Sequence, residues 1–171
     1  MEDLPQPRET VETDTVRIYG LSFNFPVTYE LEFKPKSKRE EGDLAIKSPT
    51  KSVIFVSWGD LRKVVKKLPN PAEHSRFSTE RVAKSLQGKL IDVERKEMTV
   101  NGHAAVFTHA KVEMPMGLFG GKRTLEVESL HLHCENASRY YVIHTSFNPS
   151  RPKDPGHEDA LEVVIDTFKC H

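Results

Sequence analysis

The sequence is poor in cysteine and tryptophan, carries no net charge and has no long apolar run. Its 171 residues include 2 cysteines and 1 tryptophan, and 25 basic residues balance 25 acidic ones. Two cysteines are too few for a disulfide framework. No segment approaches the roughly 18 consecutive apolar residues that a membrane-spanning helix needs. Charge neutrality argues against a purely electrostatic binder of nucleic acid or of a membrane surface.

The rest of the composition is typical of one soluble domain. Hydrophobic residues make up 37% of the chain and charged residues 29%, and the mean hydropathy is −0.53. This balance argues against a disordered chain. A chain of this length buries about 70% of its unfolded surface, which is enough for a core. We expect residues 1–15 to form a disordered acidic tail and residues 16–171 to form the domain.

The N-terminus and the cysteines together indicate a reducing compartment. The segment Met1-Glu2-Asp3-Leu4-Pro5 has neither the basic nor the apolar region of a signal peptide, so we expect a cytoplasmic location. In that compartment Cys134 and Cys170 are free thiols by default. A bridge between the two cysteines stays open as the alternative.

Hydrophobic periodicity predicts more strand than helix. Three helices are expected: one after Asp60 that is ended by Pro69 and Pro71, one capped by Ser78, and a terminal one opened by Asp154-Pro155. A change of phase along 124–134 predicts a bulge near Glu128-Ser129. Alternation predicts strands over residues 16–25, 29–33, 43–46, 52–58, 90–98, 103–114, 124–134 and 139–147. This order indicates an α+β fold with a mainly antiparallel sheet covered by about three helices.

Four segments, in this order and spacing, resemble the PsbP-like superfamily over about residues 18–169. They are Tyr19-Gly20-Leu21-Ser22-Phe23-Asn24-Phe25-Pro26, Val100-Asn101-Gly102-His103-Ala104-Ala105, Tyr140-Tyr141-Val142-Ile143 and Ile165-Asp166-Thr167-Phe168. The superfamily includes the photosystem II extrinsic protein, the Mog-type Ran GTPase-release factor and many small single-domain prokaryotic proteins.

The resemblance implies a fold and a class of function. The fold is an α/β/α sandwich around an antiparallel sheet, and the class is binding or assembly instead of catalysis. One position departs from the family, because Tyr29 stands where members often have tryptophan. The resemblance transfers no partner to this chain.

Motifs for catalysis are missing. The sequence has neither a Gly-x-Ser-x-Gly elbow nor a His-Glu-x-x-His helix. The glycine-rich segment 117–123 is not a phosphate loop, because Arg123 stands where serine or threonine is needed and a strand follows. A hydrolase or transferase with an unrecognised site is therefore the least favoured hypothesis.

The eight histidines suggest a second hypothesis, a metal-binding sheet face. His131 and His133 alternate on one strand, and a turn at 135–138 would place them opposite Val142 and Tyr140. If no bulge intervenes, Ser129 would be opposite His144. His109 on the preceding strand is expected to adjoin them. Several imidazoles on one face are suited to zinc. The alternative is a sheet face on which histidines alternate without binding anything.

Two further segments are candidate contacts for a protein partner. Basic residues are expected to form an exposed stripe on the first helix, and they are Arg62, Lys63, Lys66 and Lys67. The loop that contains Met116, Leu118 and Phe119 is apolar although it lies at a turn. The plain alternatives are a solvated helix face and a loop folded back over the core.

We therefore predict a small non-enzymatic binding module with an unknown protein partner. The alternative is a metal-binding protein that uses His131, His133, His109 and His144. We expect no cofactor apart from zinc under that alternative. Nucleic acid is not expected as a partner, because no exposed aromatics accompany the basic residues.

Overall fold

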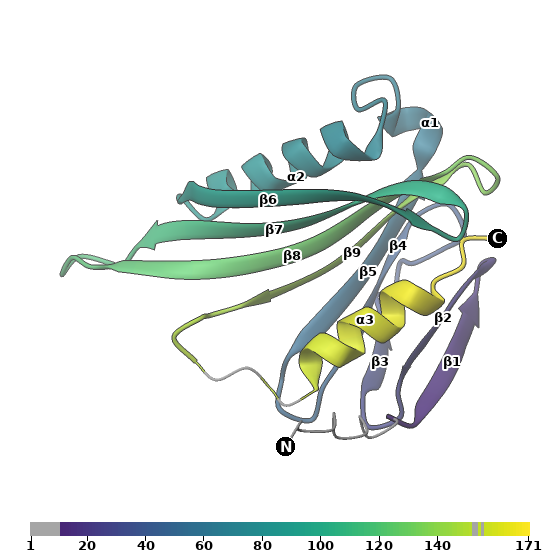
Figure 1. Ribbon diagram of the computed structural model, residues 1–171, viewed down its shortest axis with the longest axis horizontal. Coiled ribbons are helices and arrows are strands. Elements are labelled where there is room, and N and C mark those ends of the chain that lie inside the picture. The colour runs from purple at the N-terminus through teal and green to yellow at the C-terminus, as the bar shows by residue number, and fades with distance from the viewer. Residues whose placement is uncertain (1–10, 152–153, 155) are drawn as a thin grey trace, which may run out of the picture.

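A computed structural model describes residues 11–151, 154 and 156–171 of the chain (Figure 1). Its antiparallel strands form two sheets, one with two strands in the order β1-β2 and one with seven in the order β3-β4-β5-β9-β8-β7-β6. The strands are β1 (Thr13–Ile18), β2 (Leu21–Pro26), β3 (Glu30–Phe33), β4 (Gly42–Lys47), β5 (Val53–Asp60), β6 (Lys89–Val100), β7 (His103–Pro115), β8 (Lys122–Cys134) and β9 (Arg139–Phe147).

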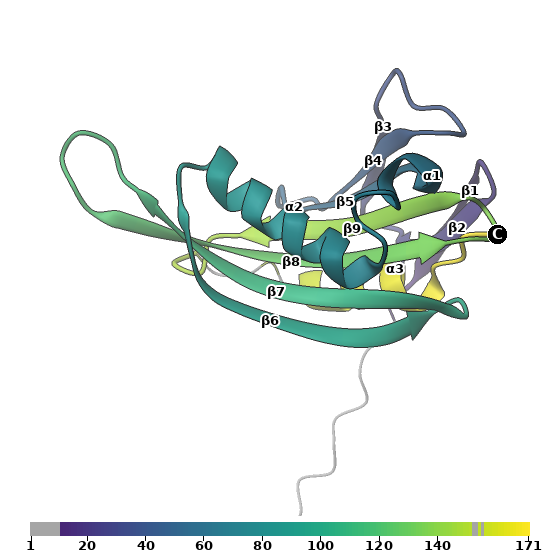
Figure 2. The ribbon, with the colours of Figure 1, turned by 90° about the horizontal axis from the view of Figure 1, so that it is seen from above.

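The helices cover opposite faces of the large sheet (Figures 1 and 2). The three helices of the described part of the chain are α1 (Leu61–Val64), α2 (Pro71–Ser85) and α3 (His157–Thr167). Helix α2 crosses β6, β7 and β8 on one face, while α3 packs with β2 on the other. The result is the expected α/β/α sandwich around an antiparallel sheet.

Helix boundaries differ most from the expectation. Helix α1 has only four residues and ends at Val64, and residues 65–67 form a turn that leads to Pro69. Helix α2 does not start at Ser78: Asn70 is its N-cap and accepts the Glu73 N–H at 2.9 Å, with Pro71 in the first turn. Helix α3 begins at His157 after Gly156, and Pro155 lies outside the described residues.

The first predicted strand is in fact a hairpin. Tyr19 and Gly20 have φ values of 53° and 84°, which suit a two-residue turn between β1 and β2. Strand β1 starts at Thr13, so the expected boundary of the domain at residue 16 falls inside a paired strand. Residues 1–10 of the expected tail lie outside the described part of the chain.

The main hydrophobic core lies between the sheet and α3. Phe23 of β2 stacks on Phe168 with ring centroids 6.2 Å apart, and Tyr141 meets the same Phe168 ring edge-on at 5.0 Å. Leu132 and Ile143 from the sheet and Val164 from α3 are buried in this core. These apolar contacts hold α3 against the central strands of the sheet.

Strand β8 runs without the bulge that was expected near Glu128-Ser129. Its register with β7 and β9 is continuous, and the irregularity lies instead in β6 between Leu90 and Asp92. The change of phase has another cause. Val127 faces α2, whereas Leu130 faces α3, and the two helices cover different stretches of the strand.

The structure settles the state of the cysteines as a disulfide between Cys134 and Cys170, with Cα atoms 6.5 Å apart. The bridge attaches the segment that follows α3 to the end of β8. Among the described residues, no helix has the length and apolar character needed to cross a bilayer.

Candidate functional site: a histidine-lined cavity and an exposed hairpin tip

Helix α2 contacts the sheet through polar side chains, which is unusual for a buried helix face. His74, Ser75 and Thr79 are its buried polar residues. The Ser75 hydroxyl bonds to the Thr108 hydroxyl of β7, and Arg95 of β6 donates to Ser75 at 3.4 Å. A cavity of about 390 Å³ adjoins this polar contact between α2 and the sheet. Its lining includes Ser57, His74, Ala110, His131, Tyr140 and His144.

Three imidazoles gather beside the cavity. The turn after β8 produces the expected register, so His133 is opposite Tyr140, His131 is opposite Val142 and Ser129 is opposite His144. His74 of α2 was not recognised in the sequence, and its Nδ1 lies 3.1 Å from Nε2 of His133. The ring centroids of His74 and His131 are 4.9 Å apart.

His131 is the most enclosed of these rings. Its side chain is 1% exposed, and neither ring nitrogen has a hydrogen-bond partner among the described residues. Burial, helped by the neighbouring imidazoles, lowers the pKa of His131 to about 3. Burial, helped by His133, lowers the pKa of His74 to about 4. Both rings are therefore neutral at pH 7, and each offers one donor and one acceptor nitrogen.

His109 does not join this group, which corrects the expectation for the fourth histidine. Neighbouring residues of a strand point to opposite faces, and Thr108 already faces α2 through its bond to Ser75. His109 therefore faces the other side of the sheet, where its Nε2 lies 2.9 Å from Oε2 of Glu126. His131, His133 and His144 share the α2 face as expected.

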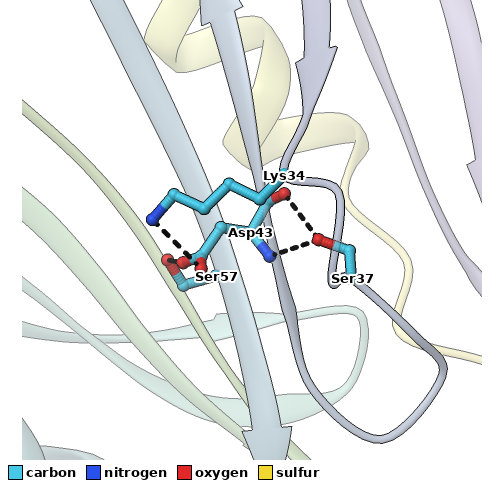
Figure 3. Close-up of polar contacts among 4 residues, drawn as sticks. All are labelled: Lys34, Ser37, Asp43 and Ser57. Atoms are coloured by element: carbon cyan, nitrogen blue, oxygen red, sulfur yellow. Dashed lines mark hydrogen bonds and ion pairs between the residues drawn. The ribbon is translucent and has the colours of Figure 1, made fainter.

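A carboxylate network borders the cavity at β4 and β5 (Figure 3). Ser57, which lines the cavity, donates its hydroxyl to Oδ1 of Asp43 at 2.7 Å. Nζ of Lys34 lies 3.3 Å from Oδ2 of the same carboxylate, and the Ser37 hydroxyl bonds to the Asp43 backbone. Burial lowers the pKa of His144, and the charge of Asp43 opposes part of that shift. The Ser57 hydroxyl is thus engaged by a carboxylate.

The apolar loop forms the tip of the long β7–β8 hairpin, which projects beyond α2 (Figure 2). Leu118 is 99% exposed and Phe119 is 102% exposed, so neither side chain folds back over the core. Met116 is also exposed, and its N–H bonds to the Gly121 carbonyl at 3.0 Å, which closes the tip. The sequence indicated these residues as a candidate contact, but it did not predict that the hairpin projects beyond α2.

The basic residues lie at α1 and in the turn after it. Arg62 makes two bonds of 3.0 Å to the Asp60 carboxylate, which lowers the pKa of Asp60. Lys63, Lys66 and Lys67 are exposed. Because α1 ends at Val64, the expected continuous helical stripe is wrong, and Lys66 and Lys67 follow the helix.

The fold and the site define a class, an antiparallel α/β/α sandwich with a cavity beneath one helix, lined by histidines and apolar side chains, and an apolar hairpin tip. No family model and no curated protein matches the sequence. Solved structures do match its fold.

One such structure is the solution structure of cyanobacterial PsbP (CyanoP) from Synechocystis sp. PCC 6803. It is 11% identical over 97% of this chain and 96% of that chain, with a TM-score of 0.59. Another is the Ran-binding protein Mog1p of Saccharomyces cerevisiae, 13% identical over 94% of this chain and 96% of that one, also with a TM-score of 0.59. The chain has the PsbP-like fold.

Proposed function

We propose that the protein is a non-catalytic module that binds a protein partner through the β7–β8 hairpin tip, made of Met116, Leu118 and Phe119. The full exposure of Leu118 and Phe119 is the observation that carries this proposal. Removal of two large apolar side chains from water by a bound partner lowers the free energy of the system and so favours binding. Mog1p, which shares the fold, is a Ran-binding protein, so the fold is compatible with protein binding.

The chemistry of the cavity supports a binding role over a catalytic one. A serine nucleophile needs a hydrogen bond to a base that takes its proton. Ser57 donates to the Asp43 carboxylate, a weak base whose negative charge is stabilised further by the ion pair with Lys34, so this carboxylate is a poor acceptor for the hydroxyl proton. Ser75 bonds to the Thr108 hydroxyl and accepts from Arg95. Neither hydroxyl is arranged for attack.

The decisive experiment is a crosslink from the tip. The full chain, with a photoreactive side chain at Leu118, is expressed in its native host and irradiated. We expect one protein to be crosslinked. Purified and mixed with the wild-type chain, that protein should bind it at least about tenfold more tightly than the double variant Leu118→Ser with Phe119→Ser, because about 1.4 kcal/mol of apolar contact accounts for a factor of ten.

The matched control replaces two exposed valines elsewhere, Val11→Ser with Val27→Ser, and should bind like wild type. Equal affinity of the tip variant and wild type, at equal melting temperature, would contradict the proposal. So would a crosslink that joins only copies of this chain.

The exposed lysines at 63, 66 and 67 are proposed as a second, electrostatic contact. If they contribute, the affinity for the crosslinked partner decreases as salt is raised to about 0.5 M, because exposed charges are screened. An affinity that does not change with salt would contradict this second contact, and the apolar tip would then be the only proposed contact.

Zinc binding at the histidines beneath α2 is the second candidate function. It is favoured by His74, whose Nδ1 is 3.1 Å from Nε2 of His133. Two imidazole ligands of a tetrahedral zinc lie about 3.3 Å apart, given bonds of about 2.0–2.1 Å. His131 would complete the set after rotation of its ring.

Its test uses the oxidised chain, in which Cys134 and Cys170 are bridged. Zinc should raise the melting temperature of wild type, and His131→Ala with His133→Ala should abolish the rise. The control is His109→Ala on the other face. No rise in wild type would remove this candidate.

A further inference from the structure

A second group of possible metal ligands lies away from the cavity, at the far end of the α3 face. His103 begins β7, Cys134 ends β8, and Cys170 and His171 follow α3 near the C-terminal end of the chain (Figure 1). One ligand atom from each residue lies within 4.8 Å of all the others. Across residues 11–151, 154 and 156–171, no other group of three or more His, Cys, Asp or Glu side chains meets this criterion.

The spacing of nitrogen and sulfur atoms in this group is that of a tetrahedral zinc site. Nε2 of His103 lies 3.7 Å from Sγ of Cys134. Nδ1 of His171 lies 3.7 Å from Sγ of Cys134 and 3.3 Å from Sγ of Cys170. With Zn–S bonds of about 2.3 Å and Zn–N bonds of about 2.0–2.1 Å, the nitrogen–sulfur edge of the tetrahedron is about 3.6 Å. Both histidines are therefore already placed for a shared ion.

We propose that these four residues form a zinc site that exists only when the Cys134–Cys170 disulfide is reduced. A thiol reductant supplies two electrons and two protons, breaks the S–S bond and leaves two thiols, while the reductant itself becomes a disulfide. Zinc then displaces the two thiol protons and binds both thiolates and both imidazoles. The two sulfurs separate from bonding distance to about 3.8 Å, the sulfur–sulfur edge of the same tetrahedron.

The surroundings suit such a site. Two thiolates neutralise the charge of zinc, so the ion adds no net charge where both cysteines are fully buried. The Asn101 amide donates to Sγ of Cys170 at 3.6 Å, the kind of outer hydrogen bond that steadies a metal thiolate. His171 is exposed, which provides a path for the ion and the reductant.

The site would preserve the same attachment in two redox states. Under oxidising conditions the disulfide joins the C-terminal segment to β8. In the reducing cytoplasm that the sequence predicts, disulfides do not persist. Zinc would then hold the same two cysteines together, so that the segment after α3 stays attached to the sheet.

The test is a cobalt and zinc titration of the full chain in both states. The disulfide is reduced with a water-soluble phosphine, which becomes its phosphine oxide as water supplies the oxygen and two protons, and excess phosphine is removed without air. Reduced wild type should bind one cobalt ion with the visible bands of a tetrahedral thiolate site, and zinc should displace it. The oxidised chain should show no such bands.

Matched variants locate the ligands. His103→Ala and His171→Ala keep the disulfide, so circular dichroism of their oxidised forms verifies the fold. Each should weaken cobalt binding in the reduced state by more than the roughly 10–100-fold typical of an outer-shell change. His109→Ala, on the same strand and face as His103, should bind like wild type. The proposal is overturned if reduced wild type binds cobalt no better than Cys134→Ala with Cys170→Ala, or if both histidine variants keep wild-type affinity.

Discussion

His131 and His74 link the stability of the fold to pH at the scale of single residues. Burial lowers the pKa of His131 to about 3 and that of His74 to about 4, from the ordinary 6.5. Below pH 6.5 the unfolded chain takes up protons at these positions, while the folded chain takes them up only near pH 4 and pH 3. The unfolded state therefore binds more protons between these limits, and acid lowers the free energy of unfolding.

His131→Leu should make unfolding less sensitive to acid. The variant removes the group with the lower folded pKa, so the decrease in the free energy of unfolding between about pH 6.5 and about pH 4 becomes smaller than in wild type. It also removes a buried polar ring, and we expect about 1–3 kcal/mol of added stability at pH 5. Urea unfolding at several pH values measures both effects.

The control for that series is His109→Gln, which removes a half-buried histidine on the other face and should retain most of the wild-type pH dependence. If His131→Leu and wild type lose stability in parallel as the pH falls, burial of His131 is not what couples this fold to acid.

At the scale of elements, the contact between β5, β9 and α2 depends on a missing side chain. Gly59 pairs with Tyr140, and a Cβ atom at Gly59 would lie 2.5 Å from the Tyr140 hydroxyl oxygen and 2.6 Å from its ring. The Tyr140 ring in turn meets His74 of α2 edge-on, with centroids 5.0 Å apart. The position of α2 over the sheet is therefore connected to the absence of a side chain in β5.

Gly59→Ala should destabilise the protein by about 1–3 kcal/mol, because the added methyl displaces the Tyr140 ring toward α2. Chemical denaturation measures the loss. In a Tyr140→Ala background the same change should cost much less, since the displaced ring is gone. Equal costs in both backgrounds would mean that backbone strain in β5, and not the ring, causes the loss.

At the scale of the whole molecule, the disulfide attaches the last segment to the sheet. Cys134 and Cys170 are 36 residues apart in sequence, and the loop between them contains β9 and α3. Closing such a loop reduces the conformational freedom of the unfolded chain. The disulfide therefore stabilises the part of the hydrophobic core that lies between α3 and the sheet.

Cys134→Ala with Cys170→Ala should lower the free energy of unfolding by about 2–4 kcal/mol relative to the oxidised wild type. Urea unfolding in the presence of a metal chelator measures this difference without any contribution from zinc. A loss under about 1 kcal/mol would show that packing of α3, through Phe168 and Val164, holds the segment without the bridge.

The strands were predictable because their signal is local. Alternation along β9 predicted its bounds, 139–147, and the turn at 135–138 predicted that His133 is opposite Tyr140. The start of α2 was missed although Asn70 and Pro71 are a typical N-cap and first residue, because a proline marks the end of one helix as readily as the start of the next, and Pro69 and Pro71 were both interpreted as the end of the preceding helix. The prediction of a bulge in β8 was wrong, because the change of phase arises from two helices that cover opposite faces of this strand and not from an extra residue.

The fold class, the antiparallel pairing of the strands and the face shared by His131 and His133 could be read from the amino-acid sequence, because each depends on periods of a few residues. The position of His74 beside them came from the packing of α2, since 59 residues separate His74 from His133. The tertiary structure also placed His103 beside Cys134, Cys170 and His171. Contacts between distant segments depend on how helices and strands pack, and local periodicity carries no record of that packing.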